Sequence, residues 1–101
     1  MAELYKIARV RDVPPGEGRV ITVGGVEIAL FNVDGSFYAL NNTCAHMGGP
    51  LAEGELDGHV VTCPWHAWHY DVRTGASLTN PEARVAAYPV TVEGEDVTIA
   101  L

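Results

Sequence analysis

The sequence is short of the features that mark several large classes of protein. Only two residues of 101 are cysteine, Cys44 and Cys63, whereas a small secreted domain held by disulfides usually carries roughly four or more. Lys and Arg number 6 against 13 Asp and Glu, a formal net charge of −7, which disfavours nucleic acid and anionic membranes as partners and favours a protein with a basic docking patch. No apolar run approaches the roughly 20 residues of a membrane span, and the N-terminus lacks the apolar core of a signal peptide. We therefore expect a protein free in the cytoplasm.

The composition is that of a folded domain. Apolar residues make up 48% of the chain and charged residues only 19%, whereas disordered chains combine low hydrophobicity with high charge. A chain of 101 residues can bury a core of its own, and no repeat, low-complexity tract or linker divides it. We expect one domain over residues 1–101.

Short runs rich in β-branched and aromatic residues recur along the chain, separated by turn signals. The runs are Leu4–Val10, Arg19–Val23, Val26–Asn32, Phe37–Asn41, Val60–Cys63, His69–Val72, Tyr88–Val92 and Val97–Leu101. Gly24-Gly25, Asp34-Gly35 and Gly94-Glu95 lie between alternating runs, where tight hairpins need positive φ angles. The pattern predicts an all-β fold, an antiparallel sandwich or open barrel with three hairpins, and one short helical turn within Pro50–Glu55.

The segment from about residue 42 to 75 is different, because it is loop-like and holds both cysteines and all four histidines. We expect it to form a small lobe inserted into the sandwich. Each cysteine has a histidine at metal-ligand spacing: Cys44-Ala45-His46 and, after sixteen residues, Cys63-Pro64-Trp65-His66. Thiolate and neutral imidazole bind both iron and zinc, so residue types alone leave the metal open. The glycines Gly48 and Gly49, just after the first pair, allow the backbone to curl closely around a bulky inorganic core.

These residues resemble the Rieske family, whose pattern is Cys-x-His, about sixteen further residues, and then Cys-Pro-x-His-Gly. The segment Trp68–Gly75 is similar to the family's strand after the second loop. The segment from Asn80-Pro81 to Val90 is similar to its proline-containing cover loop and return strand. Within the family, the chain looks like the ferredoxin components of ring-hydroxylating dioxygenase systems.

The resemblance implies one [2Fe-2S] cluster per chain, with Cys44 and Cys63 on one iron and His46 and His66 on the other. It also implies a one-electron carrier rather than an enzyme, which takes electrons from a flavin-dependent reductase and passes them to a terminal oxygenase. Two neutral histidines in place of two thiolates leave the oxidised cluster without net charge, so that it accepts an electron more easily.

The sequence departs from parts of the family pattern. High-potential members carry two further cysteines, joined as a disulfide, at the places that Gly49 and Trp65 occupy here, so this chain cannot form that disulfide. Those members also present a serine hydroxyl to the cluster from the position of Trp68, whereas the tyrosine that matches Tyr70 is kept. Ala67 stands where the family usually has glycine, which leaves the local backbone geometry in question.

Several alternatives remain open on the residues alone. Cys44 and Cys63 could form a disulfide, or the four ligands could hold a structural zinc ion. The chain could instead be the small Rieske-like subunit of an assimilatory nitrite reductase, although many of those have lost the cluster ligands. A terminal oxygenase would need a mononuclear iron held by two histidines and a carboxylate. Only His59 and His69 are spare, neither has a cysteine at ligand spacing, and we expect neither to bind metal.

Two groups of side chains near the predicted ligands have two interpretations each. Trp65 and Trp68 either contact a partner or pack over the ligand loops to exclude water. The acidic residues Glu53, Glu55 and Asp57 either steer a basic partner or form an ordinary solvated face.

Overall fold

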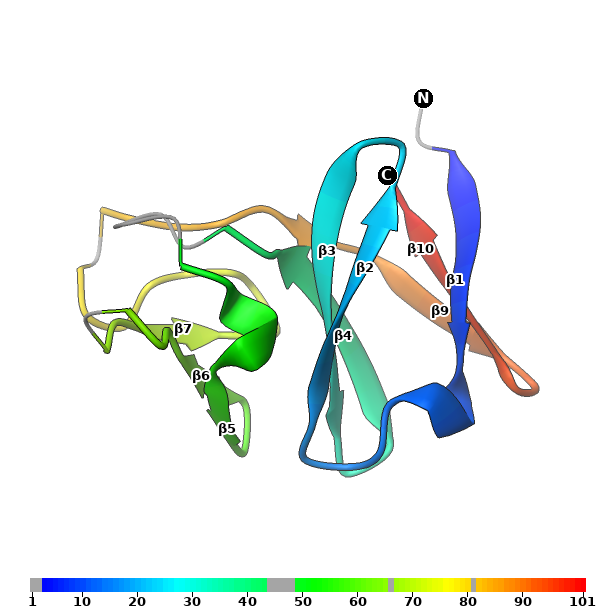
Figure 1. Cartoon of the computed structure of the whole chain (residues 1–101), viewed down its shortest axis with the longest axis horizontal. Helices are drawn as coiled ribbons and strands as arrows, with labels where there is room; N and C mark the ends of the chain where they lie inside the picture. The colour runs from blue at the N-terminus through cyan, green and yellow to red at the C-terminus, as the bar shows by residue number, and fades with distance from the viewer. Residues whose placement is uncertain (1–2, 44–48, 66, 81) are drawn as a thin grey trace.

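The structure is a computed structural model, and it describes residues 3–43, 49–65, 67–80 and 82–101. Short antiparallel strands dominate it (Figure 1), which confirms the predicted all-β class. The strands are β1 (Leu4–Arg9), β2 (Gly18–Val23), β3 (Val26–Val33), β4 (Ser36–Asn41), β5 (Glu55–Asp57), β6 (Val60–Thr62), β7 (His69–Asp71), β8 (Ala87–Tyr88), β9 (Val90–Glu93) and β10 (Asp96–Ala100). Two 3-10 turns, η1 (Val10–Asp12) and η2 (Leu51–Glu53), accompany them, and η2 confirms the predicted helical turn. In the described part of the chain no helix is long and apolar enough to cross a membrane.

The three predicted hairpins are present. Strands β2 and β3 pair up to Val23 opposite Val26, and the glycines between them, Gly24 and Gly25, have φ angles of +56° and +82°. Such angles suit the tight turns whose twist matches that of the flanking strands. The β3–β4 hairpin has two positive φ angles in its turn as well, at Asp34 and Gly35, whereas the β9–β10 turn has one, at Gly94.

Strand β3 lies in the middle of three layers. Figure 1 shows the sheet β2-β3-β4-β8 between the sheet β1-β10-β9 and the smaller sheet β5-β6-β7. Ile28 and Leu30 of β3 pack with Val97 and Ile99 of β10, whereas Phe31 faces the opposite way and packs on the small sheet. Because neighbouring residues of a strand point to opposite faces, the continuous apolar run Ile28–Phe31 suits a strand that is covered on both sides.

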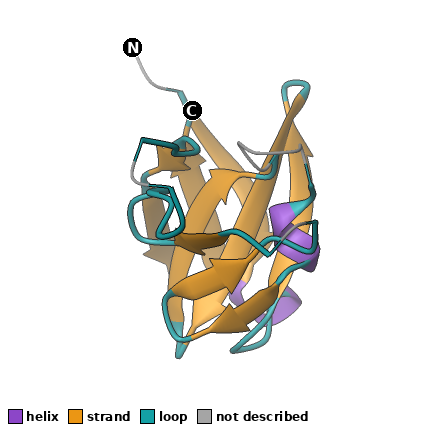
Figure 2. Ribbon diagram, turned by 90° about the vertical axis from the view of Figure 1, so that its left-hand side faces the viewer, coloured by secondary structure: helices purple, strands orange, loops and turns teal. Residues whose placement is uncertain are grey.

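The small sheet is the core of the lobe that carries the predicted ligand segment. Its middle strand, β6, contributes the buried Val61, and β7 contributes Tyr70, whose side chain is also completely buried. These side chains join Leu51 of η2 and Phe31 of β3 in one apolar cluster. Figure 2 shows the lobe from its own side, with its short strands in front of the longer ones. The lobe therefore rests on the central sheet through packed side chains.

Some predicted strand limits were wrong. The predicted strand Tyr88–Val92 is two strands, because the chain leaves the central sheet at β8 and enters the outer sheet at β9. Pro89 stands at the crossing, where a residue without an N–H cannot continue a ladder as donor. Strand β5 was not predicted; it pairs with β6 through a hairpin whose turn contains Gly58 at φ +59°.

Candidate metal centre

The second ligand loop is a tight connection between β6 and β7. The backbone N–H of Cys63, directly after β6, donates a 2.7 Å hydrogen bond to the carbonyl oxygen of Trp68. One step further from the loop, Thr62 and His69 are paired across the two strands. Inside the loop, Ala67 has a φ of +58°, an unusual angle for a residue with a side chain. Cys63 is only 1% exposed, so its thiol lies inside the lobe.

The base of the first ligand loop is closed by Asn42. Its backbone carbonyl accepts a 2.8 Å hydrogen bond from the N–H of Leu51, and its side-chain Oδ1 accepts another, also 2.8 Å, from the N–H of Ala52. Thr43 and Pro50 form an antiparallel bridge next to this pair. Asn42 is 3% exposed, and these bonds satisfy a polar side chain that would otherwise be costly to bury. Both ends of the segment that contains Cys44 and His46 are therefore held in place.

The two loops meet at Gly49. A Cβ atom added to this residue would lie 2.8 Å from Cys63 Sγ, and 3.0 Å and 3.1 Å from Cγ and Cβ of Trp65. Atoms cannot approach so closely without a shift, so the absence of a side chain at Gly49 is what allows the first loop to pass beside the thiol. The arrangement fits a metal group held from both loops, because the buried thiol of Cys63, a good metal donor when deprotonated, lies beside Gly49 of the first loop.

Only one of the four predicted ligands falls in the described part of the chain. Cys63 is described, and Cys44, His46 and His66 lie outside the described residues. Within the described residues, no three or more histidine, cysteine, aspartate or glutamate side chains gather around a common point. The ligand assignment therefore stays a prediction, as does the alternative disulfide between Cys44 and Cys63.

The two spare histidines contact protein groups. Nδ1 of His69 and Oγ1 of Thr62 are 2.9 Å apart and share a hydrogen bond. The ring of His59 lies edge-on to the ring of Tyr38, with centroids 5.7 Å apart and planes at 78°. The sequence alone did not predict either partner. Tyr38 is distant from His59 in the chain, and Thr62 faces His69 only because of the register between β6 and β7.

The two tryptophans of the second loop have different surroundings. Trp68 is partly buried and packs against the apolar cluster of the lobe. Trp65 is 51% exposed, although the base of its side chain lies against Gly49. Packing therefore accounts for Trp68, whereas Trp65 has one covered part and one part that faces solvent.

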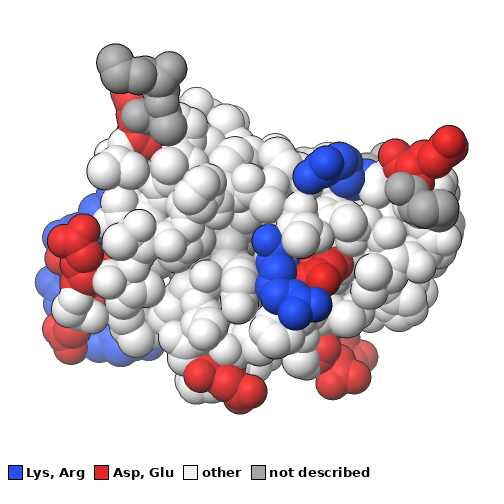
Figure 3. Space-filling view, turned by 180° about the vertical axis from the view of Figure 1, so that it is seen from behind, with Lys and Arg blue, Asp and Glu red and all other residues white. Residues whose placement is uncertain are grey.

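On the face that Figure 3 shows, the acidic side chains do not form one patch. Glu53, Glu55 and Asp57 are exposed on η2 and β5. In Figure 3 the acidic groups lie at several separate places, most of them near the rim, and some lie beside basic groups. On this face the acidic side chains contribute to the overall negative charge of the chain and do not form a single acidic patch.

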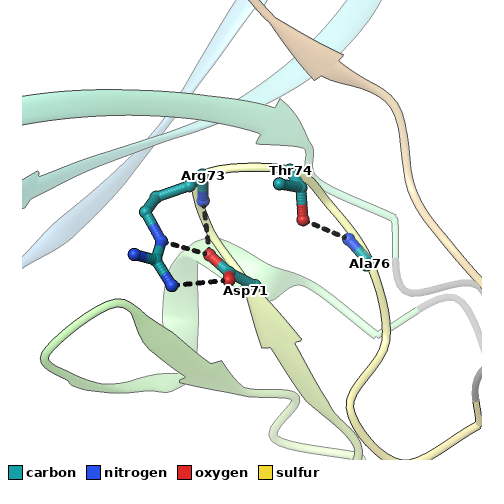
Figure 4. A network of polar contacts seen from close by, with 4 residues as sticks. All are labelled: Asp71, Arg73, Thr74 and Ala76. Atoms are coloured by element: carbon teal, nitrogen blue, oxygen red, sulfur yellow. Dashed lines mark hydrogen bonds and ion pairs between the residues drawn. The ribbon is translucent and has the colours of Figure 1, made fainter.

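An ion pair joins Asp71, the last residue of β7, to Arg73 (Figure 4). Oδ1 of Asp71 accepts hydrogen bonds from the backbone N–H of Arg73 at 2.9 Å and from its Nε at 3.0 Å, and Oδ2 accepts from Nη2 at 2.9 Å. The hydrogen bonds from the guanidinium lower the pKa of the Asp71 carboxyl below its ordinary value, against the opposing effect of burial. The pair fixes the turn that leads away from the second ligand loop.

Comparison with known proteins identifies the family of these loops. Residues 3–89 match the model of the Rieske [2Fe-2S] domain. The 3-phenylpropionate/cinnamic acid dioxygenase ferredoxin subunit of Escherichia coli (strain K12) is 46% identical over 94 residues, which are 91% of this chain and 88% of that protein. The ferredoxin component of the naphthalene 1,2-dioxygenase system of Pseudomonas aeruginosa is 38% identical over 91 residues, 89% of this chain and 88% of that protein.

Solved structures give the same result. The ferredoxin in a complex of reduced oxygenase and oxidized ferredoxin of carbazole 1,9a-dioxygenase superposes with a TM-score of 0.88 and 32% identity, over 96% of this chain and 92% of that one. A putative NADH-dependent nitrite reductase small subunit from Mycobacterium tuberculosis superposes with a TM-score of 0.93 over 100% of this chain and 96% of that one. Its identity is only 23%, so this second likeness concerns the fold alone.

Proposed function

The chain belongs to the Rieske [2Fe-2S] domain family, and from this membership we propose that it carries single electrons to the terminal oxygenase of a ring-hydroxylating dioxygenase system. It is an electron-transfer component and not itself an enzyme. The observation that carries the proposal is the match, over about nine-tenths of the chain, to ferredoxin components of such systems. The buried thiol of Cys63 beside Gly49 supports it, because it supplies a donor where the two loops meet.

The domain holds one [2Fe-2S] cluster. We propose that Cys44 and Cys63 bind one iron and that His46 and His66 bind the other. When bound, such a cluster supplies one-electron redox chemistry at a potential raised by the two histidines. The protein's part is to fix the base of each loop, which the hydrogen bonds of Asn42 and Cys63 do, and to keep water from the thiol of Cys63.

We also propose that residues 1–101 form a single Rieske domain in which the cluster-binding lobe spans about residues 42–75. The packing of Leu51, Val61 and Tyr70 with Phe31 of the central sheet supports this division, because the lobe shares its apolar cluster with the sheet instead of enclosing one of its own. A location in the cytoplasm stays a prediction.

The proposed partners are a flavin-dependent ferredoxin reductase as donor and a terminal oxygenase as acceptor. A relative has been captured with its oxygenase, which supports the acceptor. The reductase rests on the family resemblance alone. The nitrite reductase alternative is supported by a likeness of fold at 23% identity, so we place it second.

The composition of the purified holoprotein tests the cluster. We expect two irons and two acid-labile sulfides per chain, a red-brown colour, and partial bleaching with an EPR signal on reduction by dithionite. A colourless protein with one zinc ion per chain would instead support a structural zinc site and would falsify the proposed function.

Electron transfer in mixtures tests the partners. The holoprotein should shuttle electrons from a ferredoxin reductase to a dioxygenase of the phenylpropionate or naphthalene type, at a rate that falls as salt is added, because a charge of −7 attracts a basic docking face. Stimulation of a nitrite reductase large subunit, with no oxygenase reduction, would favour the second candidate.

A further inference from the structure

The exposed tryptophan of the second ligand loop makes a contact that the proposed function does not use. Trp65 lies two residues after Cys63, and its Cβ and Cγ atoms lie so close to Gly49 that a Cβ on the glycine would be 3.1 Å and 3.0 Å from them. The backbone of the first loop therefore rests on the base of the tryptophan. Gly49 is buried, although its partner is 51% exposed.

We propose that Trp65 is a positioning residue that ties the two ligand loops together and covers the sulfur of Cys63, and so controls how fast the cluster is lost to solvent. The proposal rests on the proposed function, since it assumes a cluster held between these loops. It adds a role for a side chain that the ligand assignment leaves out.

Among the described residues, the hydrogen bonds that close each loop lie at its own base. The first is held by the bonds that Asn42 makes to the chain at Leu51 and Ala52, and the second by the bond between Cys63 and Trp68. These bonds fix where each loop begins and ends, and none of them joins one loop to the other. The contact between Gly49 and Trp65 crosses from one loop to the other.

The same contact explains how the thiol of Cys63 stays buried. The residues that follow it, Pro64 and Trp65, are both exposed, yet Cys63 is 1% exposed. Gly49 approaches Cys63 Sγ as closely as it approaches the tryptophan, so the three residues pack around one point. Removal of the indole ring would open one side of this packing, and water or a chelator could reach the sulfur.

The chemistry of the contact identifies which substitutions keep it. Cβ and Cγ are the tryptophan atoms nearest to Gly49, and phenylalanine has both, with the same planar geometry at Cγ. Alanine keeps only Cβ. Leucine keeps both atoms but loses the flat ring, so it should be intermediate. Leu78, which is 58% exposed and lies outside both loops, offers a matched control for the loss of an exposed apolar side chain.

The experiment follows cluster loss in the holoprotein. Wild type and the variants W65A, W65F, W65L and L78A are incubated with EDTA under air, and the decay of visible absorbance is recorded. We expect W65A to lose its cluster roughly tenfold faster than wild type, because alanine lacks the Cγ that lies against Gly49 and the whole ring. W65L keeps Cγ but not the flat ring and should fall between, whereas W65F and L78A should stay within about twofold of wild type. The EPR signal of freshly prepared W65A should match that of wild type, since no ligand has changed.

The possible outcomes separate the proposal from its alternatives. Equal decay rates for W65A and wild type would overturn it, and a slower reduction of the oxygenase by that variant would then assign Trp65 to partner contact. A W65A chain that folds by circular dichroism but retains no cluster supports the proposal, and W65L then supplies the graded rate. A wild-type protein without iron would instead contradict the proposed function, before any variant is compared.

Discussion

Thr62 and His69 face each other across β6 and β7, and their side chains are joined by a hydrogen bond of 2.9 Å between Oγ1 and Nδ1. Thr62 and His69 are each one residue further from the second ligand loop than Cys63 and Trp68, whose hydrogen bond closes that loop. The backbone N–H of His69 also donates to Oγ1 of Thr79 at 2.9 Å. The imidazole of His69 is therefore oriented by the protein from the neighbouring strand.

This contact separates His69 from the histidines that we assign to iron. His46→Ala and His66→Ala should each abolish the assembled cluster, because an iron loses one of its ligands. His69→Ala should keep the visible and EPR spectra nearly unchanged, because it removes only one exposed hydrogen bond, on the order of 1 kcal/mol or less. Iron content and spectra of the three purified variants check this. If His69→Ala were the variant without iron, the ligand assignment would have to be replaced.

Gly49 should be intolerant of any side chain. A methyl group at this position would lie 2.8 Å from Cys63 Sγ, so Gly49→Ala should displace the thiol and lower the iron content of the purified protein. Gly18→Ala is the control, because its Cβ would lie 2.8 Å from ring atoms of Phe31 in the core and not near a ligand. That variant should lower the melting temperature, by an overpacking cost of roughly 1–3 kcal/mol, but keep the cluster spectrum. Equal iron content in Gly49→Ala and wild type would contradict the close approach of the loops.

The parts of the fold that were predicted correctly depend on local signals. Tight hairpin turns need positive φ angles, which glycine and aspartate tolerate in any surroundings. The turns at Gly24-Gly25 and Asp34-Gly35 could therefore be located from adjacent residues alone. The pairing of each cysteine with a nearby histidine is local in the same sense. It predicts a site in the lobe, where Cys63 is buried, and the set of four ligands stays a prediction.

The parts that were missed depend on contacts between distant segments. The burial of β3 on both faces arises because two other sheets cover it, and its own apolar run does not tell which segments those are. In the sequence, Asn42 is an ordinary polar residue at the end of a strand. Its role depends on the hydrogen bond that the backbone N–H of Ala52 donates to it, ten residues further along the chain. The break at Pro89 did have a local signal, since proline rarely continues a strand, and the prediction of one strand there gave that signal too little weight.

Ala67 stores backbone strain in the second ligand loop. Its φ of +58° costs a residue with a Cβ about 1–2 kcal/mol, which glycine does not lose. Ala67→Gly also gives the unfolded chain more conformational entropy, which stabilises the unfolded state by about 0.4–1 kcal/mol and offsets part of the relieved strain. We therefore expect a net increase of roughly 0.5–1 kcal/mol in the free energy of unfolding. Urea unfolding of the holoprotein measures it. Ala87→Gly, in strand β8 without a positive φ, should be destabilising instead. Destabilisation by both substitutions would show that Ala67 is unstrained.

The pair of Asp71 and Arg73 predicts how acid affects stability. Hydrogen bonds from Arg73 lower the pKa of Asp71 in the folded protein. In the unfolded chain this carboxyl has its ordinary pKa of about 3.9. The carboxylate therefore contributes stability that is fully present above the unfolded pKa and is lost as the pH falls through the lower folded value. Arg73→Gln removes the guanidinium and brings the two pKa values closer together. The urea midpoint of this variant should therefore lie below that of wild type at pH 7, and the difference should shrink as the pH is lowered to 3 and below. Arg11→Gln removes an exposed arginine of η1 and changes the net charge equally, so it controls for general charge effects. A difference between Arg73→Gln and wild type that stays constant over this range, or that Arg11→Gln reproduces, would show that the midpoint does not depend on the ionisation of Asp71.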